Sequence, residues 1–327
     1  MNGRHIVILH SGTENSARAD DSDTLEEAKE LAGLAEILNW QVTHLSYEQE
    51  EHQVVSALQQ LQPNLVINLV QSVKGSDARI DEATALLENL KMVYTGNDTQ
   101  CFRRIALKTE MKELLKKANI PTAEWFSADA AHTLPPGRYI VKSESEHCSL
   151  GIDATSIVDA AQVSGIIADR AKRFGGEWFA ERFIEGREFN VSMISDGKTL
   201  RNMPVAELTF TEMPEGVAHI VDYAGKWDED APSFVHLHRV FPAKDGPDGK
   251  LVAELARLAH ATWHCCGLKS YARIDFRVDQ QNQPYVIDVN ANPCLNIGVG
   301  VMAAAEEGGF KPENILEMII DEALATA

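Results

Sequence analysis

The chain has 327 residues, which is enough for two or three domains that each bury a core. Its 49 acidic residues outnumber its 30 basic residues and give a formal charge of -19, so neither nucleic acid nor an anionic membrane is an expected partner. Five cysteines without a CxxC pair, and no long apolar stretch or signal-peptide pattern, lead us to expect a soluble cytoplasmic protein without disulfides.

The first hundred residues alternate strand and helix patterns. Three apolar runs predict buried strands, at 5–9, 41–45 and 65–70. Helical spacing appears between them at 24–38 and 53–61, and Ser22 and Asp23 are capping candidates for the first helix. This order predicts a βαβαβ unit with a parallel sheet. Because its first turn lacks GxGxxG, the unit predicts a fold and no dinucleotide cofactor.

A second pattern begins near residues 94–97. We expect one helix over 101–118, a strand over 138–142, a helix over 159–173 and a strand over 178–183. Lys142 ends an apolar strand before a loop of small and polar residues at 143–151. Such a lysine, with backbone N–H groups of the loop, can hold a phosphate. An exposed lysine before a solvated loop would give the same local pattern.

Two carboxylates flank a glycine turn in the next segment. Glu181 and Glu188 lie seven residues apart, with Gly186 between them. If separate strands meet at this turn, one carboxylate can face a base amino group and the other ribose hydroxyls. Surface acids around a turn are the simpler interpretation of this segment alone.

The strands at 273–277 and 285–290 carry polar residues with a period of two. Arg273 and Asp275 share one face, as do Asp288 and Asn290. The turn-rich link 279–283 allows the strands to pair as a hairpin and to bring these side chains together. Two carboxylates and a carboxamide suit magnesium, although a solvated hairpin can show the same alternation.

Taken in this order, the motifs resemble those of the ATP-grasp superfamily, and within it the D-alanine–D-alanine ligase branch. They are Tyr94-Thr-Gly96, Lys108, Val141-Lys142, Ser149-Leu-Gly151, 181–188, 222–226, Arg273-Ile-Asp275 and 288–293. The resemblance implies an α/β ATP-grasp fold of three domains, with the nucleotide between the second and third. We expect an N-terminal βαβ domain at 1–95, a central lid domain at 96–184 and a C-terminal domain with the metal site at 185–327.

The resemblance also implies how the nucleotide is held. Lys108 and Lys142 would bind the α- and β-phosphates, and the loop at 143–151, with Ser149 and Gly151, would close as a lid. Glu181 and the backbone of Ile184 would hold adenine, while Glu188 would hold the ribose.

The remaining residues are assigned by the same resemblance to the reacting centre. Lys226 would reach the transferring phosphate, and Arg273 would stabilise negative charge on the phosphoryl group and the tetrahedral adduct. Asp275, Asp288 and Asn290 would hold two Mg²⁺ ions, with Mn²⁺ as a possible substitute. An aspartate stands where ligases of this branch usually have glutamate.

The resemblance implies an ATP-dependent carboxylate–amine ligase that acts through an acyl phosphate and releases ADP and phosphate. An ATP-grasp phosphotransferase and a nucleotide-binding protein without turnover are the alternatives. Small-molecule carboxylate and amine substrates, and a homodimer, follow from the family.

The amino-acid side of the site departs from the family. The segments 10–15 and 70–77 lack the expected substrate-binding signatures, Cys294 replaces a glycine, and Val299 and Gly300 align with a serine and a leucine. We therefore predict a substrate other than D-alanine. Cys294 is a packing residue or a nucleophile, and Lys74 and Arg79 are substrate-binding or solvated charges.

Overall fold

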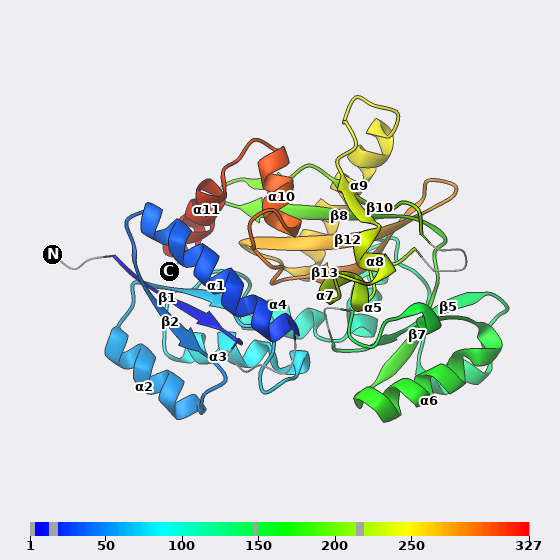
Figure 1. Cartoon of the computed structure of the whole chain (residues 1–327), viewed down its shortest axis with the longest axis horizontal. Coiled ribbons are helices and arrows are strands. Elements are labelled where there is room, and N and C mark those ends of the chain that lie inside the picture. The colour runs from blue at the N-terminus through cyan, green and yellow to red at the C-terminus, as the bar shows by residue number, and fades with distance from the viewer. Residues whose placement is uncertain (1–3, 13–18, 147–148, 214–218, 327) are drawn as a thin grey trace.

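Three β-sheets and the helices that cover them make up the computed structural model (Figure 1), which describes residues 4–12, 19–146, 149–213 and 219–326. Both ends of the chain lie beside the first sheet in Figure 1. Among the described residues, none of the helices combines the length and the apolar character that a membrane span requires.

The first sheet is parallel and has the order β2-β1-β3. Its strands are β1 (His5–His10), β2 (Gln41–Ser46) and β3 (Leu65–Leu69). Helices α1 (Ala19–Ile37) and α11 (Pro312–Ala325) pack on one face, and α2 (Glu51–Leu61) and α3 (Asp81–Asn89) pack on the other. The predicted βαβαβ unit is therefore confirmed. Helix α1 starts earlier than expected, so Ser22 and Asp23 lie inside it and do not cap it.

The single helix expected over 101–118 is wrong. The segment forms α4 (Thr99–Ile105) and α5 (Lys108–Lys117), separated by an extended Leu107. The break occurs because the Lys108 backbone N–H donates to the Glu144 carbonyl at 2.9 Å instead of continuing a helical ladder. The start of α5 is thereby fixed against the loop that follows β5.

The second sheet has the order β4-β7-β5-β6, with antiparallel pairs throughout. Its strands are β4 (Trp125–Phe126), β5 (Arg138–Ser143), β6 (Ile157–Asp159) and β7 (Trp178–Arg182). Helix α6 (Val163–Phe174) covers it, close to the predicted 159–173. Short 3₁₀ helices in the chain are η1 (Asp77–Arg79), η2 (Ala128–His132), η3 (Ala154–Ser156) and η4 (Ala160–Gln162).

The third sheet has the order β11-β10-β8-β12-β13, and β9 pairs with β8. Its strands are β8 (Gly186–Ser195), β9 (Leu200–Asn202), β10 (Ala206–Phe210), β11 (Leu237–Val240), β12 (Tyr271–Asp279) and β13 (Pro284–Asn290). Strands β12 and β13 form the predicted hairpin, with Arg273 opposite Asn290 and Asp275 opposite Asp288.

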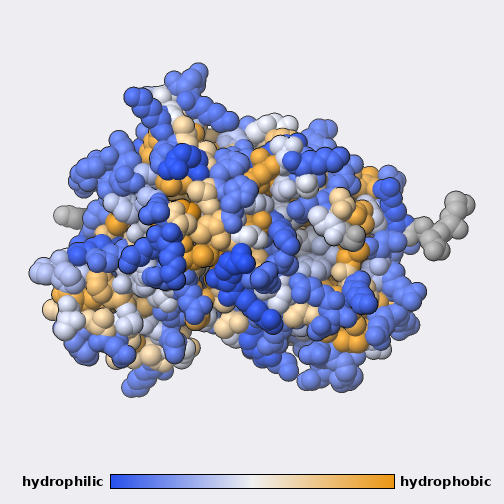
Figure 2. Space-filling view, turned by 180° about the vertical axis from the view of Figure 1, so that it is seen from behind, coloured by the Kyte–Doolittle hydropathy of each residue, from blue (hydrophilic) through white to orange (hydrophobic). Residues whose placement is uncertain are grey.

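Helices lie on both faces of the third sheet. Helix α9 (Gly249–Cys266) packs with α4 and α5 on one face, and α10 (Gly300–Glu307) packs with α11 and α1 on the other. Two short helices, α7 (Ala224–Trp227) and α8 (Pro232–Val235), stand near the second sheet in Figure 1. Figure 2 shows that hydrophilic residues cover most of the back face, as the charge of -19 leads one to expect.

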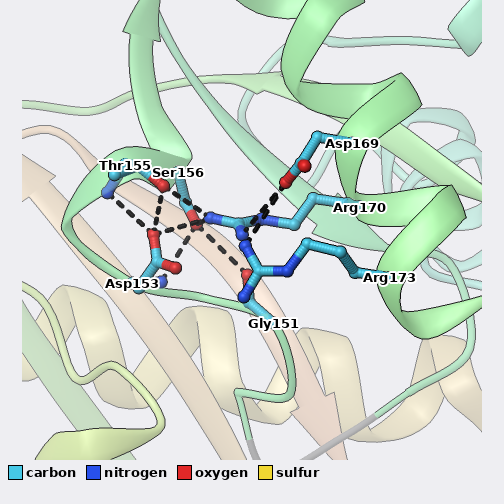
Figure 3. A network of polar contacts seen from close by, with 7 residues as sticks. All are labelled: Gly151, Asp153, Thr155, Ser156, Asp169, Arg170 and Arg173. Atoms are coloured by element: carbon cyan, nitrogen blue, oxygen red, sulfur yellow. Dashed lines mark hydrogen bonds and ion pairs between the residues drawn. The ribbon is translucent and has the colours of Figure 1, made fainter.

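A buried arginine anchors the chain that enters β6 (Figure 3). The side chain of Arg170, on α6, is 1% exposed, and its Nη2 donates to Asp153 Oδ1 at 2.6 Å and to Thr155 Oγ1 at 2.7 Å. Ser156 Oγ, also within reach of Arg170, donates to the Gly151 carbonyl at 3.3 Å. The network therefore fixes the end of the predicted lid loop to α6.

Replacing Arg170 with Met should lower the free energy of unfolding by about 2–4 kcal/mol, because a buried charge-assisted network loses its donor. Arg173→Met is the matched control: that side chain is 52% exposed on the same helix, so its loss should cost under about 0.5 kcal/mol. Urea unfolding followed by circular dichroism measures both. Equal effects of the two substitutions would show that the network does not stabilise this part of the fold.

One face of α1 carries three carboxylates that hold the segment 294–297. Asp23, Glu27 and Glu30 are spaced so that they lie on one side of the helix. The Leu295 N–H donates to Glu27 and the Ile297 N–H donates to Glu30, both at 2.7 Å. Burial raises the pKa of Glu27 to about 8, although the Leu295 N–H acts in the opposite direction.

The raised pKa of Glu27 predicts a pH-dependent stability. The folded state binds this proton more tightly than the unfolded state, so stability present below pH 4.5 is lost as pH rises towards about 8. Relative to Glu27→Gln, which cannot ionise, the wild type should lose up to about 1.4 kcal/mol per pH unit in this window.

Denaturation midpoints measured from pH 5 to 8 test this expectation. Glu26→Gln, at an exposed position of α1 whose side chain pairs with Lys29, is the control and should keep the wild-type pH profile. Parallel profiles for the wild type and Glu27→Gln would contradict the raised pKa.

Candidate functional site

A cavity of about 500 Å³ lies between the second and third sheets. Its walls come from β5, β7, β8, β10, β11, β12 and β13, together with α1, α5, α7 and α8. Every residue predicted for the site except Gly151 lines it: Lys108, Lys142, Ser149, Glu181, Ile184, Glu188, Lys226, Arg273, Asp275, Asp288 and Asn290. The structure therefore brings together residues that span more than half of the sequence.

A buried ion cluster forms one end of the cavity. Glu181 on β7 lies 2.9 Å from Lys142 Nζ on β5 and 2.5 Å from Lys112 Nζ on α5. Burial alone would raise the pKa of Glu181, but the two ammonium groups lower it, so this carboxylate stays ionised. Asp288 also acts on Lys112 electrostatically, which links the cluster to the β12–β13 hairpin.

Lys108 and the loop after β5 close the same end. Lys108 Nζ donates to the Glu146 carbonyl at 2.6 Å, and Ser149 Oγ donates to the Val221 carbonyl at 2.9 Å. Residues 147 and 148 of the predicted lid loop lie outside the described residues.

Gly151 faces away from the cavity and packs against the second sheet. It has φ +70, and an added Cβ would lie 2.5 Å from the Trp178 ring. Its neighbours Leu150 and Ile152 line the cavity instead. A side chain at this position would therefore displace the loop, because the positive φ favours glycine and the Trp178 ring leaves no room for a Cβ.

Arg277 organises the segment between β7 and β8. Its guanidinium is buried and donates to the Ile184 carbonyl at 3.1 Å and to Glu188 Oε2 at 3.1 Å. The Gly186 carbonyl accepts a further bond at 3.2 Å. Glu188 and the Ile184 backbone are thus held in fixed positions at the cavity wall.

The β12–β13 hairpin supplies a further part of the cavity wall, next to β8. Arg273 binds Asp275 through two parallel hydrogen bonds of 2.8 and 2.9 Å, and Asn190 Nδ2 donates to Asp275 Oδ1 at 2.7 Å. Asp288 and Asn290 stand opposite Asp275 and Arg273 in the register. The predicted metal ligands therefore meet on one wall, with the predicted catalytic arginine among them.

The donor set of this wall fits a hard divalent cation. Carboxylate and carboxamide oxygens are the ligands that Mg²⁺ takes in proteins, with water and phosphate oxygens completing its octahedron. No group of three or more His, Cys, Asp or Glu side chains that could hold a metal occurs in the described part of the chain. The fit consequently depends on the carboxamide of Asn290 beside the two carboxylates.

The far end of the cavity is lined by Asp23, Cys294, Asn296, Val299 and Arg239. Asp23 accepts hydrogen bonds from Asn296 Nδ2 at 2.9 Å and from Cys294 Sγ at 3.6 Å. Burial, together with nearby Glu27 and Asp23, raises the pKa of Cys294, so the sulfur is held as a thiol, which favours packing over nucleophilic attack.

Lys226 comes from the short helix α7, and Asp222 connects this helix to α8. Asp222 Oδ1 accepts from the Gly225 N–H at 2.7 Å and from Ser233 Oγ at 2.6 Å. Lys74 and Arg79, the other charges considered for the substrate, do not line the cavity. Arg79 instead pairs with Glu82 at 2.7 Å.

Four residues of the site were missed by sequence reasoning: Lys112, Asn190, Arg239 and Arg277. Arg277 shares a strand face with Arg273 and Asp275, and Lys112 lies one helical turn after Lys108, so the periodicity contained a signal for both. Asn190 and Arg239 had no local signal, because strand pairing alone brings them to the cavity. Asn190 lies opposite Asp275, and Arg239 lies opposite Leu208.

Comparison with known proteins places the chain in a family. The family model described as D-ala D-ala ligase C-terminus matches residues 114–321. A D-alanine–D-alanine ligase of Sinorhizobium medicae is 26% identical over 99% of this chain and 99% of its own length.

Solved structures show the same fold. The D-alanine–D-alanine ligase of Bacillus anthracis, solved with ATP, superposes with a TM-score of 0.76 at 16% identity, covering 99% of this chain and 98% of that one. A D-Ala:D-Ser ligase from Enterococcus faecalis superposes with a TM-score of 0.72 at 14% identity, covering 98% and 99%. Since the family model covers more than half of the sequence, the chain belongs to the D-alanine–D-alanine ligase family of ATP-grasp carbon–nitrogen ligases.

Proposed function

We propose that this chain forms an amide bond between a carboxylate and an amine through an acyl phosphate, and that its substrates are amino acids or small peptides other than D-alanine. One observation carries the proposal: a single cavity joins the buried Lys142–Glu181 pair to the Arg273–Asp275 wall. Lysines suit a polyphosphate, and the hairpin suits the metal and the reacting groups.

The nucleotide would occupy the lysine end. Lys108 and Lys142, which line the cavity, would bind phosphates, and Glu188, held by Arg277, would accept from ribose hydroxyls. A carboxylate accepts about four hydrogen bonds, so Glu181 can accept from an adenine amino group while it holds both lysines. The backbone of Ile184 would complete the adenine contact.

The metal would lie on the hairpin wall. Asp275, Asp288 and Asn290 would hold two Mg²⁺ ions, or Mn²⁺ in their place, and the ions would neutralise the phosphates during transfer. Asp275 already accepts from Arg273 and Asn190, which fixes the direction of its oxygens before any ion binds.

The reaction would have two steps. A carboxylate oxygen first takes the γ-phosphoryl group of ATP, with Lys226 and Arg273 balancing its charge, and ADP leaves. The amine nitrogen then attacks the acyl carbon, the bond from that carbon to the phosphate oxygen breaks, and phosphate leaves as the nitrogen loses a proton. The protein supplies position and charge in both steps.

The end of the cavity around Cys294 differs from the family pattern, and this difference supports a substrate other than D-alanine. Cys294 and Val299 stand at positions where the family has a glycine and a serine, and both line the cavity. The three-domain division at 95 and 184, and a homodimer, belong to the same proposal and depend on the family resemblance.

ADP release that requires both a carboxylic acid and an amine tests the ligase reaction.

Asp275→Asn should lower kcat by about three orders of magnitude, because a transition-state charge loses its preorganised environment. Asp245→Asn, on an exposed loop away from the cavity, should leave kcat unchanged.

Full ADP release with an alcohol and without any carboxylic acid would overturn the ligase in favour of a phosphotransferase. Wild-type kcat in Asp275→Asn would remove the metal assignment.

A further inference from the structure

The guanidinium of Arg277 on β12 bonds to two other stretches of the chain. Its Nε donates to the Ile184 carbonyl at 3.1 Å and its Nη2 to the Gly186 carbonyl at 3.2 Å, both where β7 connects to β8. Its Nη1 donates to Glu188 Oε2 at 3.1 Å and to the His219 carbonyl at 2.9 Å. Four of the five N–H donors of this planar group are therefore used, three of them on backbone carbonyls.

Burial and strand pairing fix the position of Arg277. Its residue is 5% exposed, and β12 pairs with β8 on one side and with β13 on the other. The ring of Phe183 packs on the guanidinium, with 5.0 Å between its centroid and Arg277 Cζ. Arg277 also lines the cavity, as do Arg273 and Asp275 of the same strand. A buried side chain on a paired strand gives the loops that it contacts a fixed reference point.

The segment 219–227, which ends in α7, is held from two sides. The Tyr223 N–H donates to the Ile152 carbonyl at 3.2 Å, which ties the segment to the loop between β5 and β6 of the second sheet. The bond from Arg277 to the His219 carbonyl ties the start of the same segment to the third sheet. The position of the segment over the cavity therefore depends in part on Arg277.

We propose that Arg277 is a positioning residue that holds the adenosine-binding residues and the segment carrying Lys226 in one arrangement. This inference rests on the proposed function, which assigns Ile184 and Glu188 to adenosine and Lys226 to the transferring phosphate. A guanidinium is suited to the role because its planar fork contacts several acceptors in fixed directions. Loss of Arg277 should therefore weaken the binding of a triphosphate more than that of a diphosphate, because only the triphosphate reaches Lys226.

Isothermal titration calorimetry with two nucleotides, ADP and a non-hydrolysable ATP analogue, each with magnesium, tests the proposal. Arg277→Met should raise the Kd of ADP about 10-fold, because Ile184 and Glu188 lose their fixed positions. The Kd of the analogue should rise about 100-fold, because Lys226 is displaced as well. In the Lys226→Met background the two factors should become equal, since the contact with the γ-phosphate is already lost.

Arg277→Lys continues the test if the methionine variant does not fold. A lysine keeps a positive charge beside Glu188, with which Arg277 forms its ion pair. Its three donors lie on one atom, so it cannot replace the fork at all four acceptors. The Kd of the analogue should rise about 10-fold in this variant, and that of ADP less than about threefold.

Arg187→Met is the matched control. Arg187, on β8, pairs with both Glu207 and Asp248, but its side chain is 34% exposed and does not line the cavity. Its replacement removes an ion-paired arginine from the same sheet, and both Kd values should stay within about twofold of the wild type.

Equal rises in Kd for the two nucleotides in the Arg277 variants would overturn the proposal, as would an effect of the same size and ratio in Arg187→Met. Failure of the ligase function would be seen separately. A wild type that binds the ATP analogue but releases no ADP with any acid and amine would reject the proposed reaction. The ratio of the two Kd values would still decide the role of Arg277, because it requires no turnover.

Discussion

The contact of one carboxylate, Glu181, with two buried lysines connects the parts of the molecule that form the cavity. Lys142 lies on the neighbouring strand of the second sheet, and Lys112 lies on the helix that packs beneath the third sheet. Lys112 also donates to Thr122 Oγ1 at 2.9 Å, and Thr122 donates to the Val286 carbonyl on β13 at 2.7 Å. Removing Glu181 would leave two buried ammonium groups without their carboxylate, so this residue holds the arrangement together.

The cavity has two chemically different ends. At the lysine end, buried ammonium groups face a wall that Arg277 holds in place through Glu188 and the Ile184 carbonyl. At the other end, α1 fixes the segment 294–297, and Arg239 adds a positive charge. The β12–β13 hairpin lies between them and carries the groups suited to metal and phosphoryl transfer. This order of sites suits the proposed phosphorylation of an acid and its capture by an amine.

The features that were predictable are those with a local period. Alternation along β12 and β13 predicted the hairpin and the juxtaposition of Asp275 with Asp288, because a period of two determines which side chains share a face. The apolar runs of the first unit predicted its parallel sheet because they alternate with helical segments, as strands do in a βαβαβ unit. The motif order then indicated the family, which the match over residues 114–321 supports independently.

The features that were missed depend on contacts between distant segments. The break before Lys108 arises from its bond to Glu144, 36 residues away, and helical propensity alone favours a continuous helix. Arg239 has no neighbouring motif, since its place in the cavity follows from pairing between β11 and β10. Asp23 looked like a cap because the pattern could not show that α1 begins at Ala19.

The central claim is that a carboxylate becomes the acyl donor through phosphorylation in this cavity. An acid substrate labelled with ¹⁸O in both carboxylate oxygens tests it directly, with magnesium, ATP and an amine present. We expect one labelled oxygen in the inorganic phosphate and the other in the amide product. Unlabelled phosphate, released together with ADP, would contradict the acyl phosphate and the account of the site that depends on it.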